Sequence, residues 1–310
     1  MILQKSRLTR RIFAVCAVAT ASTQARAQAA APQPINPWAD DSSRVQWLPT
    51  NGRSLGGRHV LVWAPNDSVS DAALRALVDT LDIGVGALRT LMRAPLAWQR
   101  IQSRPVVFYL GPGRFIAHGS GTGAVFISMY HVRSRGAPFL HEASHELLAP
   151  ERPFYGEEYG DTAQGRRAED QIPLWLFEGL PDVLAQTVTA ETGLRDGDVF
   201  SIGGLARVDS TCAARVRGSA RGAEVLAAVG RSSALAALFT TDRPQVAPIF
   251  YACSQSLTKY FVEEMGVAKV IALFPAMKAG NWEQRVQEFA GRSVEALRSE
   301  WMKRLDPSAM

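Results

Sequence analysis

The sequence of 310 residues predicts an α+β fold, in which a small mixed sheet is followed by a mainly helical C-terminal part. Two patterns point to this class. Residues 58–110 alternate between strand, helix and strand character, and the chain from about Pro173 onward has mainly helical periodicity. The composition agrees, because 47% hydrophobic and 20% charged residues are typical of a chain that buries a core, not of a disordered tail or a membrane bundle.

The first 27 residues have the features of a secretory signal peptide. They contain five basic residues and no acidic residue, an apolar run over residues 12–22, and small residues at Ala25 and Ala27 that suit cleavage after Ala27. The run is short for a transmembrane span, and an uncleaved anchor is the alternative. Cleavage predicts a secreted or periplasmic protein with no membrane span. It also removes five positive charges and brings the formal net charge of +5 to zero, which leaves no electrostatic argument for a nucleic-acid partner.

The next elements can be placed from composition and periodicity. Residues 28–57 are rich in Ala, Pro and polar side chains and predict a flexible lead-in, so that the folded region begins near Arg58. Residues 58–65 are β-branched and apolar and predict a strand. Residues 70–92 have helical periodicity behind a Ser/Asp start, and residues 104–110 return to strand character.

A second group of elements completes the sheet and begins the helical part. Residues 121–130 predict a strand that leaves a glycine-rich turn, and a helix follows from near Pro138. Residues 294–305 predict a last amphipathic helix. The sequence therefore divides into an N-terminal subdomain over residues 58–185 and a mainly helical C-terminal subdomain over residues 186–310.

The segment PFLHEASHELLAP, residues 138–150, contains the pattern H-E-x-x-H. On a helix, His141 and His145 point the same way and lie one turn apart, so that both could bind one metal ion. Glu142 lies about 100° around the helix from His141, where it could reach a metal-bound water as a general base. The alternative is a polar patch on an ordinary amphipathic helix, although a chance match has a probability of only roughly one in a hundred.

A third ligand has to be a carboxylate, because no histidine follows His145. The best candidate is Glu178 within PLWLFEGLPDVLAQ, residues 173–186, whose apolar helical face would bury the segment and point Glu178 inward. Asp182 lies one helical turn further and could accept a hydrogen bond from the other ring nitrogen of a bound histidine. Four more acidic residues lack such an apolar frame and are interpreted as solvated charges: Glu146, Glu157, Glu158 and Glu169.

These two segments resemble the gluzincin metallopeptidases, zincins with HExxH on one helix and a glutamate ligand on a following helix, often within W-L-x-E-G. In this chain the two elements read HEASH and WLFEG. The resemblance implies zinc (Zn2+) as the cofactor, His141, His145 and Glu178 as its ligands, and Glu142 as the general base. The spacing from Glu178 to Asp182 is similar to that of thermolysin-type members.

The resemblance extends beyond the metal site and implies a zincin-like catalytic domain. Residues 251–266 are similar to a tyrosine-led helix found downstream in secreted bacterial members, and residues 288–305 are similar to their closing helix. Coverage thus runs from about Arg58 to Leu305, with the two metal-site segments specific and the remainder weak. One departure is Pro181, where many relatives have alanine, and it leaves open whether the third-ligand helix begins before or after this position.

The implied activity is that of a zinc-dependent peptidase, which hydrolyses peptide or protein substrates through a metal-activated water. The resemblance implies Tyr251 as the residue that stabilises the oxyanion, and Tyr155 and Tyr159 in the polar stretch 151–171 are its rivals. It also implies residues 124–129 as an edge strand that pairs with the substrate, for which a plain core strand is the alternative. The alternative is a catalytically inactive zincin-like binding or scaffold domain. Intact ligands and an intact Glu142 favour the enzyme, whereas the cleavage specificity and the oligomeric state stay open.

Two cysteines remain after the signal is removed, because Cys16 lies within it. In an oxidising compartment Cys212 and Cys253 can pair, which predicts a disulfide across 41 positions near Tyr251. Two buried free thiols are the alternative.

Overall fold

The computed structural model describes residues 40–93, 104–121, 123–148, 172–194, 196–197, 204–231, 235–277 and 282–305. Residues 35–310 form one compact unit. The predicted signal peptide, Tyr155 and Tyr159, and Glu157, Glu158 and Glu169 lie outside the described residues. In the part that is described, no helix is both long enough and apolar enough to cross a membrane.

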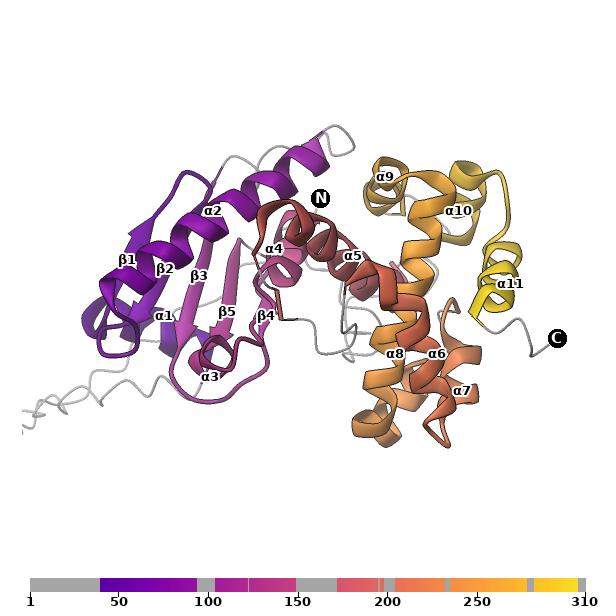
Figure 1. Ribbon diagram of the computed structural model, residues 1–310, viewed down its shortest axis with the longest axis horizontal. Coiled ribbons are helices and arrows are strands. Elements are labelled where there is room, and N and C mark those ends of the chain that lie inside the picture. The colour runs from indigo at the N-terminus through magenta and orange to yellow at the C-terminus, as the bar shows by residue number, and fades with distance from the viewer. Residues whose placement is uncertain are drawn as a thin grey trace, which may run out of the picture. The chain divides into compact units, whose positions relative to one another are not determined.

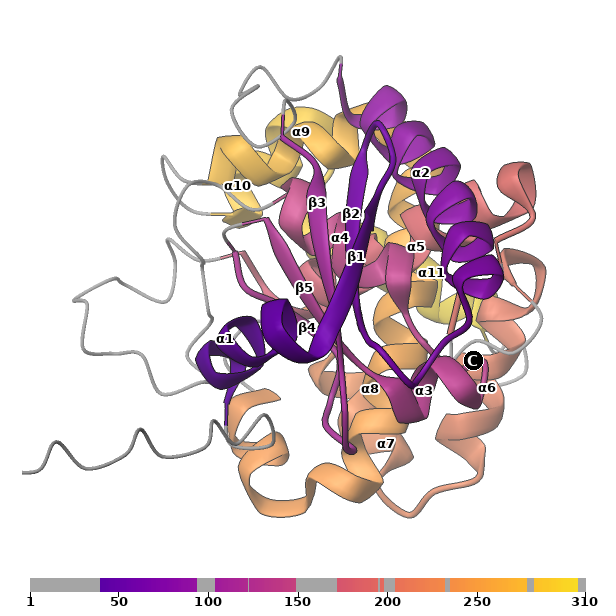
Figure 2. The ribbon, with the colours of Figure 1, turned by 90° about the vertical axis from the view of Figure 1, so that its left-hand side faces the viewer.

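The fold is mixed α+β and contains a five-stranded sheet in the order β1-β2-β3-β5-β4 (Figure 2). The strands are β1 (Gly52–Gly56), β2 (Val60–Pro65), β3 (Val106–Gly111), β4 (His118–Gly119) and β5 (Ala124–Ser128). The three central strands β2, β3 and β5 are parallel, whereas β1 and β4 pair antiparallel at the two edges. The small mixed sheet predicted from the sequence is therefore present.

Helix α2 (Asp71–Arg93) connects β2 to β3 and packs on one face of the sheet together with α4 (Phe139–Leu148). The Ser/Asp start is a cap, because the Ser70 hydroxyl accepts a hydrogen bond from the amide of Ala73 at 3.2 Å. Strand residues that face α2 and α4 are fully or almost fully buried, namely Val60, Val62, Ala64, Val106, Phe108, Leu110, Val125 and Ile127. The alternation along β2 and β3 follows from the two-residue repeat of a strand.

Two elements occupy the stretch that the sequence assigns to a flexible lead-in, so this part of the prediction is wrong. Helix α1 (Asp41–Asn51) begins at a cap in which Asp40 accepts a hydrogen bond from the Ser43 amide at 2.7 Å, and β1 follows it directly. The polar composition conceals the helix because α1 buries only Leu48 and Arg44. The strand expected over residues 121–130 is also shorter, because the Ser128 hydroxyl caps a short helix, α3 (Met129–Arg133).

The chain after β5 and α4 is mainly helical, as predicted. The helices are α5 (Leu174–Thr192), α6 (Val208–Arg217), α7 (Gly222–Ala228), α8 (Leu235–Met265), α9 (Val267–Met277), α10 (Trp282–Ala290) and α11 (Val294–Leu305), with a short 3-10 helix, η4 (Leu205–Arg207), before α6. Helix α5 contacts α4 and α8 (Figure 1) and runs across position 185, so the predicted subdomain boundary falls inside a helix.

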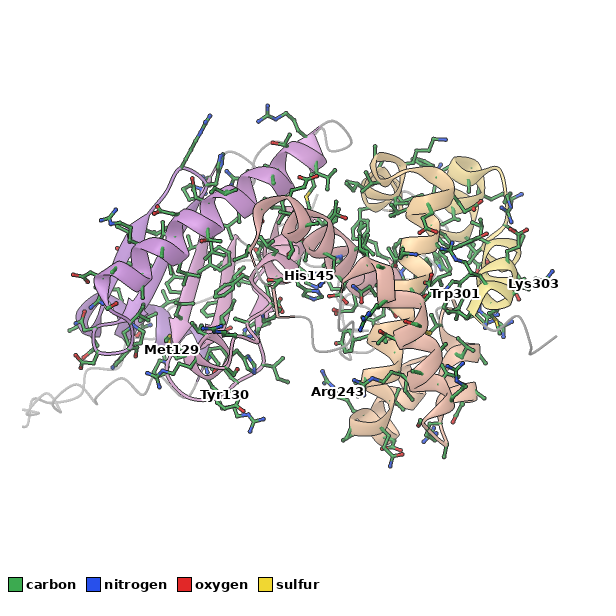
Figure 3. The ribbon with its side chains drawn as sticks, viewed as in Figure 1. Met129, Tyr130, His145, Arg243, Trp301 and Lys303 are labelled. Atoms are coloured by element: carbon green, nitrogen blue, oxygen red, sulfur yellow. A yellow bond between two sulfur atoms is a disulfide. The ribbon has the colours of Figure 1, made fainter. Side chains whose placement is uncertain are left out.

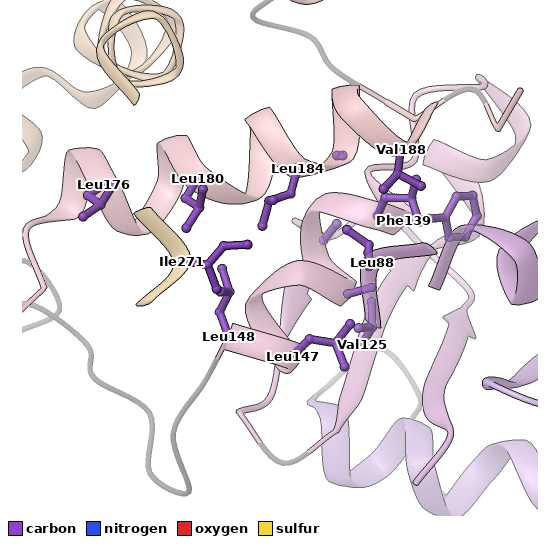
Figure 4. Close-up of a cluster of buried hydrophobic side chains, with 14 of the residues drawn as sticks. Leu88, Val125, Phe139, Leu147, Leu148, Leu176, Leu180, Leu184, Val188 and Ile271 are labelled. Carbon is purple, nitrogen blue, oxygen red and sulfur yellow. The ribbon is translucent and has the colours of Figure 1, made fainter. Parts of the chain in front are cut away.

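The core is continuous from the sheet to the helices. Figure 4 shows its central part, where side chains of α2, β5, α4, α5 and α9 meet. At the end of α4, Leu148 lies beside Ile271 on the side of α5 that carries Leu180 and Leu184, and Leu147 lies beside Val125 of β5. Burial of these side chains fixes α4 and α5 side by side, and the polar residues of both helices meet on the remaining side.

Cys212 on α6 and Cys253 on α8 form a disulfide, as the sequence predicts. The two Cα atoms are 4.7 Å apart and both side chains are fully buried. Helix α8 is interrupted by a kink at Asp242, whose backbone is not helical (φ −153°, ψ 49°). Residue 251 lies within the second part of α8 and does not begin a helix as the resemblance implies, so the bridge is not at a helix start.

Candidate metal centre

The two histidines of the H-E-x-x-H pattern lie on α4 with their rings on the same side of the helix. The Nε2 atoms of His141 and His145 are 3.1 Å apart. This proximity follows from the four-residue spacing, since residues one turn apart on a helix are neighbours. Figure 3 shows His145 between the sheet and helix α8.

Helix α5 brings Glu178 to the two imidazoles. Its Oε2 atom is 3.5 Å from Nε2 of His141 and 3.5 Å from Nε2 of His145. The helix starts at Leu174, so Pro181 lies inside it. The third-ligand helix therefore begins before Pro181. Buried Trp175, Leu176 and Leu180 form the apolar face that holds Glu178 in place.

The three groups could hold a metal ion. In a tetrahedral zinc site with ligand distances of about 2.0–2.2 Å, neighbouring ligand atoms are roughly 3.3–3.6 Å apart. The separations observed here are 3.1, 3.5 and 3.5 Å. The two separations that involve Glu178 fall within this range and the separation of the two imidazole nitrogens is slightly shorter, so the three atoms are close to the spacing of ligands of one small ion.

Asp182 determines which nitrogen of His141 faces the cluster. Its Oδ1 atom is 2.6 Å from Nδ1 of His141, so the ring donates its Nδ1 proton and presents Nε2 to the other two groups. Burial lowers the pKa of His141, but the charge and hydrogen bond of Asp182, together with Glu178 and Glu142, outweigh it and hold the pKa well above the ordinary value. A metal ion would take the place of the proton on Nε2.

The carboxyl groups of Glu178 and Glu142 have opposite pKa shifts. Burial opposes ionisation of Glu178, but hydrogen bonds from the two imidazoles outweigh it and lower the pKa of Glu178 to about 2. Burial raises the pKa of Glu142, and His141 and His145 oppose this rise only in part. An acid that stays ionised suits a ligand, and a buried acid with a raised pKa suits a group that takes up and releases protons.

Glu146 is fully buried, so its interpretation as a solvated charge is wrong. Its carboxylate accepts hydrogen bonds from the backbone amides of Gly121, at 2.6 Å, and Gly123. A Cβ atom at Gly119 would lie 2.4 Å from Oε1 of Glu146, so only glycine allows this approach. Glu146 thus ties α4 to the turn between β4 and β5, and burial raises its pKa. In the sequence, the glycines at 119, 121 and 123 were the signal that another part of the chain approaches this turn closely.

A second carboxylate that the sequence does not identify is Asp196. It accepts hydrogen bonds from the amides of Leu140, at 2.8 Å, and His141, at 3.2 Å. These are first-turn amides of α4, which have no partner within the helix. Burial raises the pKa of Asp196 to about 7, although the two amide hydrogen bonds oppose this rise. Asp196 is 55 residues from His141, so no local pattern indicates this cap.

Two implications of the resemblance concern the surroundings of the cluster. Tyr251 is half-buried on α8, one turn before Ser254, whose backbone lies against Gly179 of α5. The expected edge strand over residues 124–129 is not an edge, because β5 lies between β3 and β4 and pairs with both. The edge on this side of the sheet is β4, which runs antiparallel to β5.

Comparison with known proteins adds no assignment. No family model matches the sequence, and it has no significant match among curated proteins or solved structures.

Proposed function

We propose that this protein is a zinc-dependent peptidase of the gluzincin type, with His141, His145 and Glu178 as the metal ligands. The observation that carries the proposal is the convergence of three ligand atoms at 3.1–3.5 Å beside a buried glutamate that follows the first histidine. Zinc is the metal of choice because two imidazoles and one carboxylate are a donor set typical of catalytic zinc sites.

Each residue of the site has a separate role in the proposed reaction. Asp182 orients His141, and the ionised Glu178 supplies the negative ligand. When bound, the zinc ion supplies a Lewis acid that lowers the pKa of a water and polarises the scissile carbonyl group. Glu142 accepts a proton from the attacking water and donates it to the leaving amine. Tyr251 is the proposed donor to the developing oxyanion.

The remaining parts of the proposal concern setting and substrate. A zincin-like fold is supported by the mixed sheet with an antiparallel edge strand, the α4 helix beneath it and the ligand helix α5. The proposed substrate is a peptide or protein. Export to a secreted or periplasmic location is supported by the signal-like first 27 residues and by the buried disulfide, because disulfides persist in oxidising compartments.

Two substitutions separate the base from the ligand. Glu142→Gln keeps the size of the side chain but removes the proton acceptor, so we expect zinc to stay bound near one per chain while peptide cleavage falls about 100- to 10,000-fold. Glu178→Gln replaces an anionic ligand with a neutral amide. Zinc affinity should then fall by more than the roughly 10- to 100-fold expected when a residue that only hydrogen-bonds a metal ligand is lost. Activity should fall with the affinity.

The measurements are zinc content at controlled free metal and cleavage of a peptide library followed by mass spectrometry. Glu191→Gln is the matched control, because Glu191 lies exposed at the end of α5, and neither quantity should change. Wild-type cleavage rates in Glu142→Gln, or full zinc occupancy in Glu178→Gln at low free metal, would refute the role given to that residue. Wild-type protein that binds zinc but cleaves no peptide would support the scaffold alternative.

A further inference from the structure

A cavity of about 650 Å³ lies at the carboxyl-terminal end of the parallel strands. Its walls come from the segments that directly follow β2, β3 and β5, and they include Ser68, Pro112, Arg114, Met129, Tyr130 and Arg133. None of the wall residues belongs to the metal cluster. In Figure 3, Met129 and Tyr130 lie at the end of the sheet, apart from His145. Crevices beyond the carboxyl ends of parallel strands are the usual ligand sites of open α/β sheets.

The charge on the cavity wall is entirely positive. Arg114 and Arg133 line it together with neutral residues, and neither guanidinium group forms an ion pair with a carboxylate of the described residues. The sequence contains seven arginines and no acidic residue between Asp82 and Glu142, so the surrounding segments supply no local counter-charge. Asp67, next to Ser68 in the chain, is exposed and is not part of the wall.

The cavity also has an apolar side. Met129 is 3% exposed and, with Pro112, gives an apolar surface, whereas the ring of Tyr130 is 48% exposed. The guanidinium carbon of Arg114 lies 4.7 Å from the centre of the Tyr130 ring. This cation–π contact restricts a side chain that would otherwise sample many rotamers, and a guanidinium group held in this way can donate two parallel hydrogen bonds to an oxyanion.

We propose that this cavity binds a small organic oxyanion, a carboxylate or a phosphate monoester that carries an apolar group. Arg114 and Arg133 contact the anionic oxygens, and Tyr130 and Met129 contact the apolar group. The volume falls within the range of about 300–1,000 Å³ that is usual for small-molecule sites, which combine apolar walls with a few polar groups. The site is independent of the metal cluster and of the proposed peptidase activity.

Isothermal titration of the purified protein with three probes tests the ligand class. Benzoate and phenyl phosphate carry the two oxyanions on the same ring, and benzamide is a neutral analogue. We expect at least one anion to bind with a dissociation constant below about 1 mM, and benzamide to bind at least tenfold more weakly. The stronger of the two anions identifies the oxyanion that the site prefers. Absence of binding by both anions, or equal binding of benzamide, would overturn the proposal.

Two double variants test the location. Arg114→Ala with Arg133→Ala should weaken binding of the preferred anion at least tenfold. Arg215→Ala with Arg217→Ala removes the same two charges from the exposed side of α6 and should change the affinity less than twofold. Both pairs lie at the surface, and thermal unfolding checks that each variant folds. Equal losses in the two double variants would show that net charge, not this cavity, attracts the anion, and would reject the site.

Discussion

At the scale of single residues, the candidate metal centre depends on carboxylates with different environments. Glu178 faces both imidazoles, whereas Asp182 contacts the far side of the His141 ring. Glu142 lies buried on the same helix as the imidazoles, and burial raises its pKa. The chemical type of the side chain is the same in all three, and the surrounding partners decide whether it serves as a ligand, an orienting group or a base.

Substitution of Asp182 should weaken the centre without abolishing it. Asp182→Asn keeps a hydrogen-bond acceptor near Nδ1 of His141 but removes its negative charge, so that the imidazole becomes a weaker ligand. We expect zinc affinity to fall about 10- to 100-fold. Competition with a chelator measures this, and Asp79→Asn, at an exposed position of α2, is the control. Unchanged affinity in Asp182→Asn would contradict the orienting role.

At the scale of elements, the crossing of α5 and α8 places the ligand helix. A Cβ atom at Gly179 would lie 2.3 Å from Oγ1 of Thr258 and 2.6 Å from the carbonyl oxygen of Ser254. The glycine that follows Glu178 therefore lets the two helix backbones approach closely. The Trp175 ring packs against Phe261 at 5.1 Å on the same pair of helices. Glu178 is thus fixed by a helix crossing in addition to its own hydrogen bonds.

Gly179→Ala should consequently destabilise the protein. Alanine favours a helix over glycine by up to about 1 kcal/mol, but overpacking against a backbone atom costs about 1–3 kcal/mol, so we expect a net loss in the free energy of unfolding. Denaturation in guanidinium chloride measures it. Gly56→Ala is the control, because the nearest atom to its Cβ would be 3.8 Å away. Increased stability of Gly179→Ala would show that α8 can shift to accept a methyl group.

At the scale of the whole molecule, a disulfide and several ion pairs connect the C-terminal helices. The disulfide joins α6 to α8. Beside it, Lys259 of α8 lies 3.1 Å from Asp209 of α6 and 2.7 Å from Glu263, and Glu263 also pairs with Arg304 of α11. These ion pairs are partly exposed and contribute little each. The disulfide should therefore contribute more to the free energy of unfolding than these ion pairs.

Removal of the disulfide should lower the free energy of unfolding substantially. The closed loop of 41 residues corresponds to roughly 4 kcal/mol in the chain-entropy model, and we expect a loss of about 2–4 kcal/mol for Cys212→Ala with Cys253→Ala. Guanidinium unfolding with and without reductant measures it. Reductant should destabilise the wild type and leave the double variant unchanged. Equal stability of the oxidised wild type and the double variant would refute this contribution.

Features that depend on local periodicity could be predicted from the amino-acid sequence. The four-residue spacing places His141 and His145 on one side of α4, and the same spacing places Asp182 one turn from Glu178 on α5. Helices α2 and α11 follow their amphipathic patterns almost to the residue. Such features are readable because neighbours along a helix or strand are close in space whatever the rest of the chain does.

Features that join distant segments of the chain became visible only in the folded protein. It buried Glu146 against the β4–β5 turn, placed Asp196 at the start of α4, and packed α1 onto the sheet. It also placed β5 inside the sheet and put two arginines at the end of its parallel strands. Whether a carboxylate is solvated, a ligand or a helix cap depends on which distant backbone or side chain approaches it, and that approach leaves no periodic signature in the sequence.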